Sequence, residues 1–192
     1  MICRSECRID LHKYWNGSND EMSARGGPEE ILFLPEHLPW LDDHCQSILD
    51  IGCGSGHMVN YWLSKGKEAF GITYQAKEID LAATAKISTI ILGDAHKLPW
   101  PDNTFDGIFM WDVLEHTLSP FIVLKEAWAV TKPNGHGLVF IPGDKWATCK
   151  YHILCPTILQ MKHLCKLTGW EVTEVFDDPK GCGVVYYLRV FK

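Results

Sequence analysis

The stretch SILDIGCGSGHMVNYWLSKG, Ser47–Gly66, holds three glycines within the five residues GCGSG. The apolar run before them is short and carries β-branched side chains, which predicts a buried strand that ends at the first glycine. After them, Val59, Trp62 and Leu63 share one face of a predicted helix, which a further glycine ends. A strand, a glycine-rich turn and a helix in this order predict a loop that something approaches closely.

Three kinds of small ligand compete for such a loop: a dinucleotide, a nucleotide phosphate, and a nucleoside without phosphate. A phosphate-binding P-loop requires Lys followed by Ser or Thr at the helix start, whereas His57 and Met58 stand there. A dinucleotide fold uses G-x-G-x-x-G with a pyrophosphate at the helix N-terminus. Here the spacing is G-x-G-x-G, and the preceding Asp50 would repel a pyrophosphate. A cationic ligand without phosphate suits this loop better.

The rest of the chain alternates between strand and helix patterns. Further strands are predicted at residues 68–74, 88–94, 105–112 and 135–142, and further helices at 76–87, 120–131 and 156–168. Segments 170–178 and 183–192 alternate around a Gly-rich turn, which predicts a hairpin. Strands that alternate with helices form parallel sheets through right-handed crossovers. The predicted fold class is α/β, a Rossmann-like doubly wound sheet, mostly parallel, with an antiparallel C-terminal hairpin strand.

Length and charge limit the function classes. A chain of 192 residues buries about 70% of the surface that its unfolded form exposes, enough for one core. The net charge of −6 argues against a sequence-independent grip on nucleic acid. No stretch approaches the roughly 18 apolar residues that span a bilayer, and the start does not read as a secretory signal. We therefore expect no membrane association and a cytoplasmic protein.

The cysteines predict free thiols rather than disulfides, because eight of them are scattered through an enzyme-like sequence in a reducing compartment. The most metal-like cluster is Cys149, His152 and Cys155. It lacks a fourth ligand at zinc-finger spacing, so no metal site is expected.

Two sequence regions resemble the motifs of a known protein family. LDIGCGSG resembles the first motif of the class I S-adenosylmethionine-dependent methyltransferases. GDAHKLPWPDNTFDGIFMWDVLEHTLSP and LKEAWAVTKPNGHGLVFIPG resemble the small-molecule, type 11-like branch, which typically reads GDA-x-x-LPF-x-D-x-x-FD and then VLEH. The resemblance covers about residues 46–143. It implies a single S-adenosylmethionine-binding methyltransferase domain over residues 28–192. The preceding residues 1–27 are polar and Gly-rich, which predicts either partial disorder or a lid over the site.

The resemblance implies roles for the cofactor-binding residues. The three loop glycines would let the backbone approach the methionine and ribose portions of S-adenosylmethionine, and Asp50 would lie near its amino-acid end. Asp94 would accept a hydrogen bond from the adenine amino group, and the Ala95 amide would face the ring. The full implied set is Asp50, Gly52, Cys53, Gly54, Gly56, Thr73, Tyr74, Gln75, Glu78, Asp94, Ala95, Trp111, Asp112 and Val113.

One departure affects the ribose. Most family members carry an acid at the end of the second strand, whereas this chain has Thr73 in GITYQAKE. A similar GIT variant occurs in cyclopropane-synthase-like and tocopherol-like methyltransferases, where Thr and later polar side chains share the task. By that analogy Thr73, Gln75 and Glu78 would hold the ribose. Alternatively, Glu78 is a solvated helix residue.

Three side chains are candidate catalytic residues, each with a structural alternative. His116 titrates in the range of a general base, or it lines the pocket as part of a generic segment. His152 follows the fifth strand, where acceptor contacts are common in this fold, or it is a surface residue. Asp112 could attract a cationic acceptor at the end of its strand, or cap the next short helix.

Aromatic residues are dense around the predicted opening and could shield a sulfonium or stack on a flat acceptor. They are Tyr14, Trp15, Trp111, Trp146 and Tyr151. Trp62 and Trp128 instead lie on apolar helix faces, which predicts core positions. Residues 143–156 form a short connection, so the site is open or is completed by residues 1–45 or by the second subunit of a homodimer.

The resemblance implies methyl transfer from S-adenosylmethionine to a small-molecule acceptor by in-line displacement, with S-adenosylhomocysteine as product. WDVLEH stands where DNA and RNA amino-methyltransferases carry an Asn-Pro-Pro-Tyr-like tetrapeptide. The glycine spacing and the absence of an acid directly after the second strand disfavour an NAD-dependent oxidoreductase. The alternative is a non-catalytic sensor or partner subunit that binds S-adenosylmethionine or S-adenosylhomocysteine.

Overall fold

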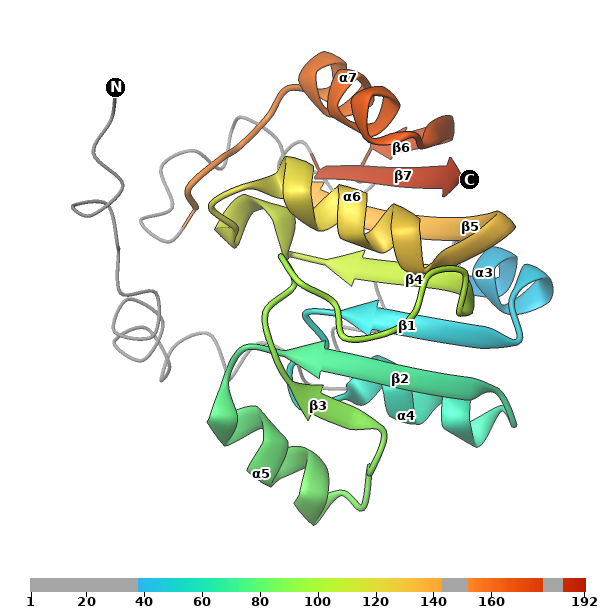
Figure 1. Ribbon diagram of the computed structural model, residues 1–192, viewed down its shortest axis with the longest axis vertical. Coiled ribbons are helices and arrows are strands. Elements are labelled where there is room, and N and C mark those ends of the chain that lie inside the picture. Colours follow the sequence, from blue (N-terminus) through green and yellow to red (C-terminus); the bar gives the residue numbers. More distant parts are fainter. Residues whose placement is uncertain (1–37, 143–151, 178–184) are drawn as a thin grey trace.

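The computed structural model describes residues 38–142, 152–177 and 185–192, which form a seven-stranded sheet of order β3-β2-β1-β4-β5-β7-β6 (Figure 1). The strands are β1 (Ser47–Ile51), β2 (Glu68–Thr73), β3 (Ile90–Leu92), β4 (Phe105–Trp111), β5 (Thr131–Pro142), β6 (Glu171–Asp177) and β7 (Val185–Phe191). Strands β1 to β5 pair in parallel, whereas β7 is antiparallel to both β5 and β6. The predicted fold class is confirmed, and the antiparallel strand β7 lies one position from the edge.

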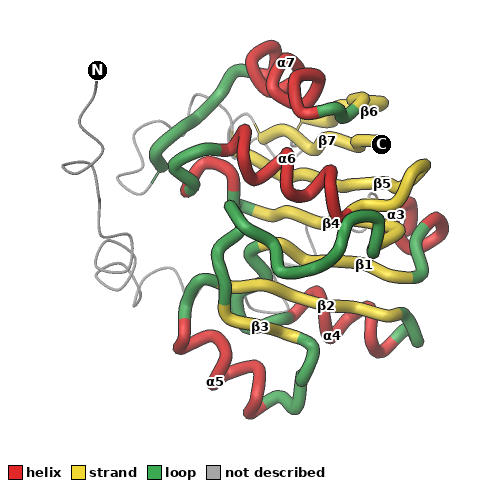
Figure 2. The backbone as a smooth tube through the Cα atoms, viewed as in Figure 1, coloured by secondary structure: helices red, strands yellow, loops and turns green. Residues whose placement is uncertain are grey.

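The helices form the outer layers on both sides of the sheet (Figure 2). They are α3 (Leu38–His44), α4 (His57–Ser64), α5 (Ala76–Thr84), the 3₁₀ helix η2 (Leu114–His116), α6 (Pro120–Val130) and α7 (Ile158–Thr168). Helices α6 and α7 cover one face, α3 and α4 cover the other, and α5 lies beside the edge strand β3. Among the described helices, none has the length and apolar character that a membrane crossing requires.

Local sequence accounts for the ends of α7. The Thr157 hydroxyl accepts a hydrogen bond from the Gln160 amide, while the Gln160 side chain accepts one from the Thr157 amide at 2.9 Å. This reciprocal capping box satisfies two amides that the first turn leaves without helical partners. Gly169 ends the helix at φ 103°, a left-handed conformation that favours glycine. The predicted boundaries of this helix are therefore confirmed to within two residues.

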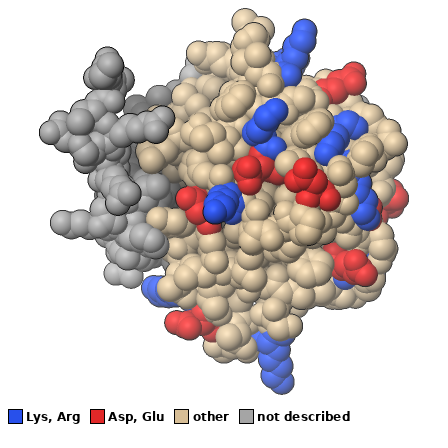
Figure 3. Space-filling view, in the orientation of Figure 1, with Lys and Arg blue, Asp and Glu red and all other residues tan. Residues whose placement is uncertain are grey.

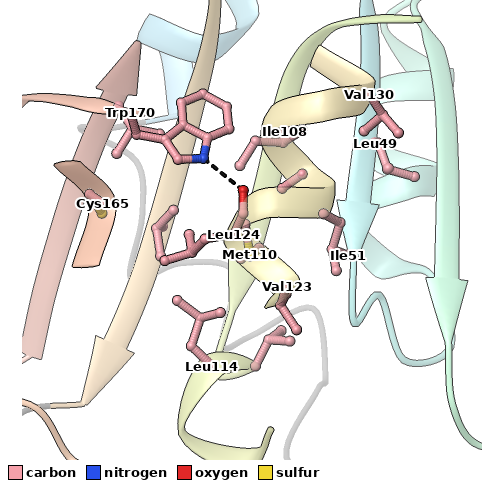
Figure 4. Close-up of a cluster of buried hydrophobic side chains, with 14 of the residues drawn as sticks. Leu49, Ile51, Ile108, Met110, Leu114, Val123, Leu124, Val130, Cys165 and Trp170 are labelled. Atoms are coloured by element: carbon pink, nitrogen blue, oxygen red, sulfur yellow. Dashed lines mark hydrogen bonds between the residues drawn. The ribbon is translucent and has the colours of Figure 1, made fainter. Parts of the chain in front are cut away.

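The core divides into two clusters, one on each face of the sheet. Between the sheet and α6, the first cluster includes Leu49 and Ile108, and the Trp170 indole N–H donates to the Leu124 carbonyl at 3.0 Å (Figure 4). In the second cluster, Trp62 packs edge-on against Phe109 with ring centroids 5.3 Å apart. Fully burying one large apolar side chain contributes on the order of 1.5–3 kcal/mol. Both faces of the sheet are therefore anchored to helices.

The packing of the core differs from the sequence prediction in two respects. Trp62 is fully buried, as predicted, whereas Trp128 is only partly buried and packs against the first cluster. No helix is predicted before the first strand, yet α3 lies there and buries Leu41 completely. The seven residues of α3 are too few to show helical periodicity, so its position depends on this tertiary contact.

Strand direction fixes where a ligand can bind. The carboxyl ends of β1, β2 and β4 lie along the same edge of the sheet, to the left in Figure 1. Ligands of open α/β sheets bind outside this edge, where the strand order reverses. Here the reversal falls between β1 and β4. On the face drawn in Figure 3, acidic and basic side chains are interspersed, and neither sign forms a patch.

Candidate functional site

The glycine loop after β1 is held against β2 by its backbone. The amides of Gly52 and Cys53 both donate to the Ile72 carbonyl, at 2.9 and 3.1 Å. Gly52, Gly54 and Gly56 all have positive φ, at 78°, 52° and 88°. L-residues with side chains rarely adopt this conformation, so the loop needs glycine at all three positions.

The three glycines differ in what surrounds them. A Cβ on Gly52 would lie 2.4 Å from Cγ2 of Val113, and one on Gly56 would lie 2.1 Å from Cδ1 of Ile90. A Cβ on Gly54 would approach only Oε2 of Glu78, at 3.9 Å. Gly52 and Gly56 therefore make room for the protein's own side chains. Among the described residues, only the Glu78 carboxylate lies near the Cβ position of Gly54.

Asp50 is the last residue but one of β1 and is 3% exposed, between Gly71 of β2 and Phe109 of β4. Its burial raises the pKa of this carboxyl from 3.8 to about 8, because desolvation penalises the charged form. At neutral pH the carboxyl is therefore largely protonated, and a nearby cation would favour its ionisation.

Cys53 turns its side chain into the fold. A Cβ on Gly71 would lie 2.5 Å from its Sγ, so the thiol occupies the space that this glycine leaves. Burial raises the pKa of the Cys53 thiol well above its usual range. The thiol is therefore unreactive, and only the backbone of Cys53 can face a ligand in the loop.

The end of β2 brings three predicted ribose contacts together. Thr73 is buried, and its hydroxyl accepts a long hydrogen bond of 3.4 Å from the Gln75 amide. The buried Oε1 of Gln75 has no hydrogen-bond partner among the described residues. Glu78, in the first turn of α5, is 7% exposed and faces the glycine loop. The alternative that Glu78 is a solvated helix residue is therefore wrong. The neighbouring Tyr74 is half-buried.

The loop after β3 presents Asp94, whose side chain is 48% exposed. Its Oδ1 accepts hydrogen bonds from the His96 amide at 2.9 Å and pairs with His96 Nδ1 at 2.7 Å. The Ser119 amide donates to His96 Nε2 at 3.2 Å. His96 thus joins Asp94 to the start of α6. Ala95, which lies between Asp94 and His96 in the sequence, is half-buried against the first core cluster.

At the end of β4, the Trp111 indole stacks on Phe140 with ring centroids 4.5 Å apart, and its N–H donates to Asp112 Oδ2 at 3.0 Å. Asp112 is exposed and has φ 50°, an uncommon conformation for a residue other than glycine that is often found at functional sites. Val113 is buried against Gly52. The Asp112 carboxylate is therefore engaged by Trp111 in this conformation.

The structure brings the two candidate histidines together. The rings of His116 and His152 lie 4.9 Å apart at 76°, and Oε1 of the fully buried Glu115 lies 3.7 Å from His116 Nε2. Cys155 Sγ lies 3.4 Å from His152 Nδ1. The interpretation of His152 as an isolated surface residue is therefore wrong, because this side chain is half-buried against His116.

Some site residues escape prediction or lie beyond the described part of the chain. Sequence reasoning missed His96 and Glu115, and only the position of Glu115 inside VLEH could have indicated a role. The contact between His152 and Cys155 agrees with their grouping in the sequence, whereas the contact of His152 with His116 was not predicted. Other predicted contributors lie outside the described residues. They are the segment 1–27 with Tyr14 and Trp15, and Trp146, Cys149 and Tyr151.

Comparisons with known proteins identify the family of this chain. A methyltransferase-domain family model matches residues 49–139. The malonyl-[acyl-carrier protein] O-methyltransferase of Yersinia pestis is 30% identical over 154 residues, which cover 74% of this chain and 58% of that protein. The ubiquinone biosynthesis O-methyltransferase of an Azoarcus species is 27% identical over 135 residues, 65% of this chain and 55% of that protein. The chain thus spans little more than half the length of these relatives.

Solved structures share the fold. A protein of Pyrococcus horikoshii superposes with a TM-score of 0.73 at 19% identity, covering 93% of this chain and 98% of that one. An S-adenosylmethionine-dependent methyltransferase of Thermotoga maritima superposes with a TM-score of 0.70 at 17% identity, covering 95% and 99%. With the matched methyltransferase domain, the glycine loop at the carboxyl edge of the sheet and this shared fold, the chain belongs to the class I S-adenosylmethionine-dependent methyltransferases.

Proposed function

We propose that this chain binds S-adenosylmethionine at the carboxyl ends of β1, β2 and β4 and transfers its methyl group to a small-molecule acceptor. The observation that carries the proposal is the open flank of Gly54 opposite the Glu78 carboxylate. The Cβ positions of the two other glycines are occupied by the protein's own side chains, so among the described residues the flank of Gly54 leaves a gap for a ligand.

The residues around the gap fit the cofactor. The buried Oε1 of Gln75, which lacks a partner among the described residues, can accept a hydrogen bond from a ribose hydroxyl, together with Glu78. Asp94 can accept one from the adenine amino group, because its exposed carboxylate keeps Oδ2 available beside the Oδ1 that His96 engages. Asp50 would face the positively charged amino-acid end.

When bound, S-adenosylmethionine supplies a methyl group activated by a positively charged sulfur. The chain's own task is then to align the acceptor with that methyl group and to exclude water. Trp111, held by Phe140 and bonded to Asp112, forms a rigid wall on this side. The Glu78 carboxylate favours a cation in the gap, since opposite charges attract strongly where water is excluded, and a bound cation would in turn favour ionisation of Asp50.

The acceptor would lie beyond β4, next to His116 and His152. A neutral imidazole can take a proton from a hydroxyl acceptor at neutral pH, and Asp112 can attract a cationic one. Leu118, Ile153 and Leu154 are exposed apolar side chains on the segments that carry this histidine pair. They would contact an acceptor that has an apolar part.

Turnover tests the proposal. The purified chain is incubated with methyl-labelled S-adenosylmethionine and a panel of hydroxyl, phenol, carboxyl and amine acceptors, and S-adenosylhomocysteine is measured by mass spectrometry. We expect acceptor-dependent product formation that Gly54→Val abolishes. Cofactor binding without turnover across the panel would favour a sensor or partner subunit, and failure to bind would refute both functions.

Two further features stay predictions. A homodimer would complete the acceptor side of the site, and light scattering on the purified chain tests this. A cytoplasmic location is also a prediction, and cell fractionation tests it.

A further inference from the structure

The geometry points to a divalent metal site formed by Glu115, His116 and His152, at the acceptor side of the cofactor gap. The sequence predicts no metal site, because its most metal-like cluster, Cys149, His152 and Cys155, lacks a fourth ligand. In the folded chain, His152 lies beside His116 of the LEH segment. Metal binding itself is independent of the proposed function, and only its use in catalysis rests on methyl transfer.

The spacing of the donor atoms fits a shared ion. One ligand atom from each of the three residues lies within 4.8 Å of the others. Two donors bound to one ion at about 2.0–2.2 Å lie roughly 3–3.6 Å apart. Glu115 Oε1 and His116 Nε2 are 3.7 Å apart, close to that range and too long for a direct charge-assisted hydrogen bond.

The scaffold holds the three ligands before any ion arrives. Glu115 and His116 are consecutive in η2, and the His116 amide donates to the Val113 carbonyl at 3.0 Å. The amides of Ile153 and Leu154 both donate to the Glu115 carbonyl, at 2.7 and 3.2 Å. Backbone hydrogen bonds therefore fix the segment after His152 directly onto η2, so binding requires little reorganisation.

Burial and a second contact support the site. Glu115 is fully buried and His116 is 9% exposed, and buried carboxylates in proteins are paired or bind metals. Cys155 Sγ lies against His152 Nδ1 at 3.4 Å, so an ion would be bound by Nε2 of that ring. Partners of this kind on the second ring nitrogen orient metal-binding histidines.

The donor set selects the class of ion. Two imidazole nitrogens and one carboxylate oxygen suit first-row divalent metals such as Zn²⁺, Fe²⁺, Co²⁺ and Mn²⁺, whereas Mg²⁺ and Ca²⁺ prefer oxygen ligands alone. Three protein ligands leave coordination positions open. An acceptor hydroxyl bound there would release its proton to solvent more readily. The resulting oxygen would form a bond to the methyl carbon as the S–CH3 bond breaks, with S-adenosylhomocysteine as the leaving group.

Cobalt titration tests the site. The full chain is treated with a chelator, dialysed and titrated with CoCl₂ while visible absorption is recorded, because the d–d bands report coordination and thiolate ligands add a near-ultraviolet charge-transfer band. We expect one Co²⁺ per chain without a thiolate band. His152→Ala should weaken binding at least tenfold, with Glu115→Gln as a second variant. His163→Ala, on the exposed side of α7, should leave binding unchanged.

Three results would overturn the site: absence of saturable binding, equal binding in His152→Ala and the parent chain, or a thiolate band showing that cysteines hold the ion. Calorimetric titration of the same metal-free protein with S-adenosylhomocysteine separates the two proposals. If that ligand binds while Co²⁺ does not, the metal site fails and the cofactor site stands.

Discussion

Gly54→Val separates a ligand-binding role of the loop from a structural one. Gly54 has φ 52°, and among the described residues a Cβ there would approach only Glu78 Oε2, at 3.9 Å. A valine therefore overlaps none of these residues at its Cβ, but it stands where the cofactor would lie. Gly66, at the end of α4, is the matched control. Its φ is 75° and a Cβ would meet no atom within 4 Å.

The expected losses of stability follow from the surroundings of Gly54 and Gly66. A side chain held at positive φ costs about 1–3 kcal/mol, and each kcal/mol lowers Tm by roughly 2–4 °C in a chain of this size. Gly54→Val and Gly66→Val should therefore lose similar amounts of stability. Gly52→Ala should lose about 1–3 kcal/mol more than backbone strain alone, because its Cβ would lie 2.4 Å from Val113.

The assay combines thermal unfolding with calorimetric titration by S-adenosylhomocysteine. Gly54→Val should bind at least 100-fold more weakly than the parent chain, a loss of about 2.7 kcal/mol, while Gly66→Val binds normally. If Gly54→Val and Gly66→Val bind the ligand equally well, the open flank of Gly54 is not the cofactor cradle.

Two further predictions concern the acids of the site. Asp94→Ala should weaken S-adenosylhomocysteine binding by about 1–3 kcal/mol, whereas Asp80→Ala, on the exposed side of α5, should not; unchanged calorimetric affinity in Asp94→Ala would reject the adenine contact. Burial raises the pKa of Asp50 from 3.8 to about 8, so the folded chain keeps this proton while the unfolded chain releases it. The contribution of Asp50 to stability is therefore greatest below about pH 4 and is lost as pH rises to about 8. Asp50→Asn should then unfold at higher urea concentration than the parent chain at pH 9, and equal or lower midpoints would contradict the buried, desolvated environment of Asp50.

The hydrophobic periodicity of the sequence predicts most of the strands and helices. Alternating strands and helices with right-handed crossovers allow few sheet orders, and the positions of β1, β2, β4 and the carboxyl-edge site follow from them. The short helix α3 was missed, because its seven residues carry too little pattern and its Leu41 is buried only by tertiary packing.

The details of the site depend on contacts between distant segments, which one sequence does not reveal. Gly52 and Gly56 look like ligand glycines, yet Val113 and Ile90 fill the space beside them. Glu78 is not part of the apolar face of α5, so the sequence pattern does not predict its burial. It is buried because it faces the loop after β1. His116 and His152 meet only because the 152–154 segment bonds to η2.

A crystal structure of the full chain grown with S-adenosylhomocysteine tests the central claim most directly. We predict ligand density in the gap beside Gly54, with the ribose at Gln75 and Glu78 and the adenine at Asp94. Density at another place on the chain, or a gap that stays empty at saturating ligand, would contradict the account.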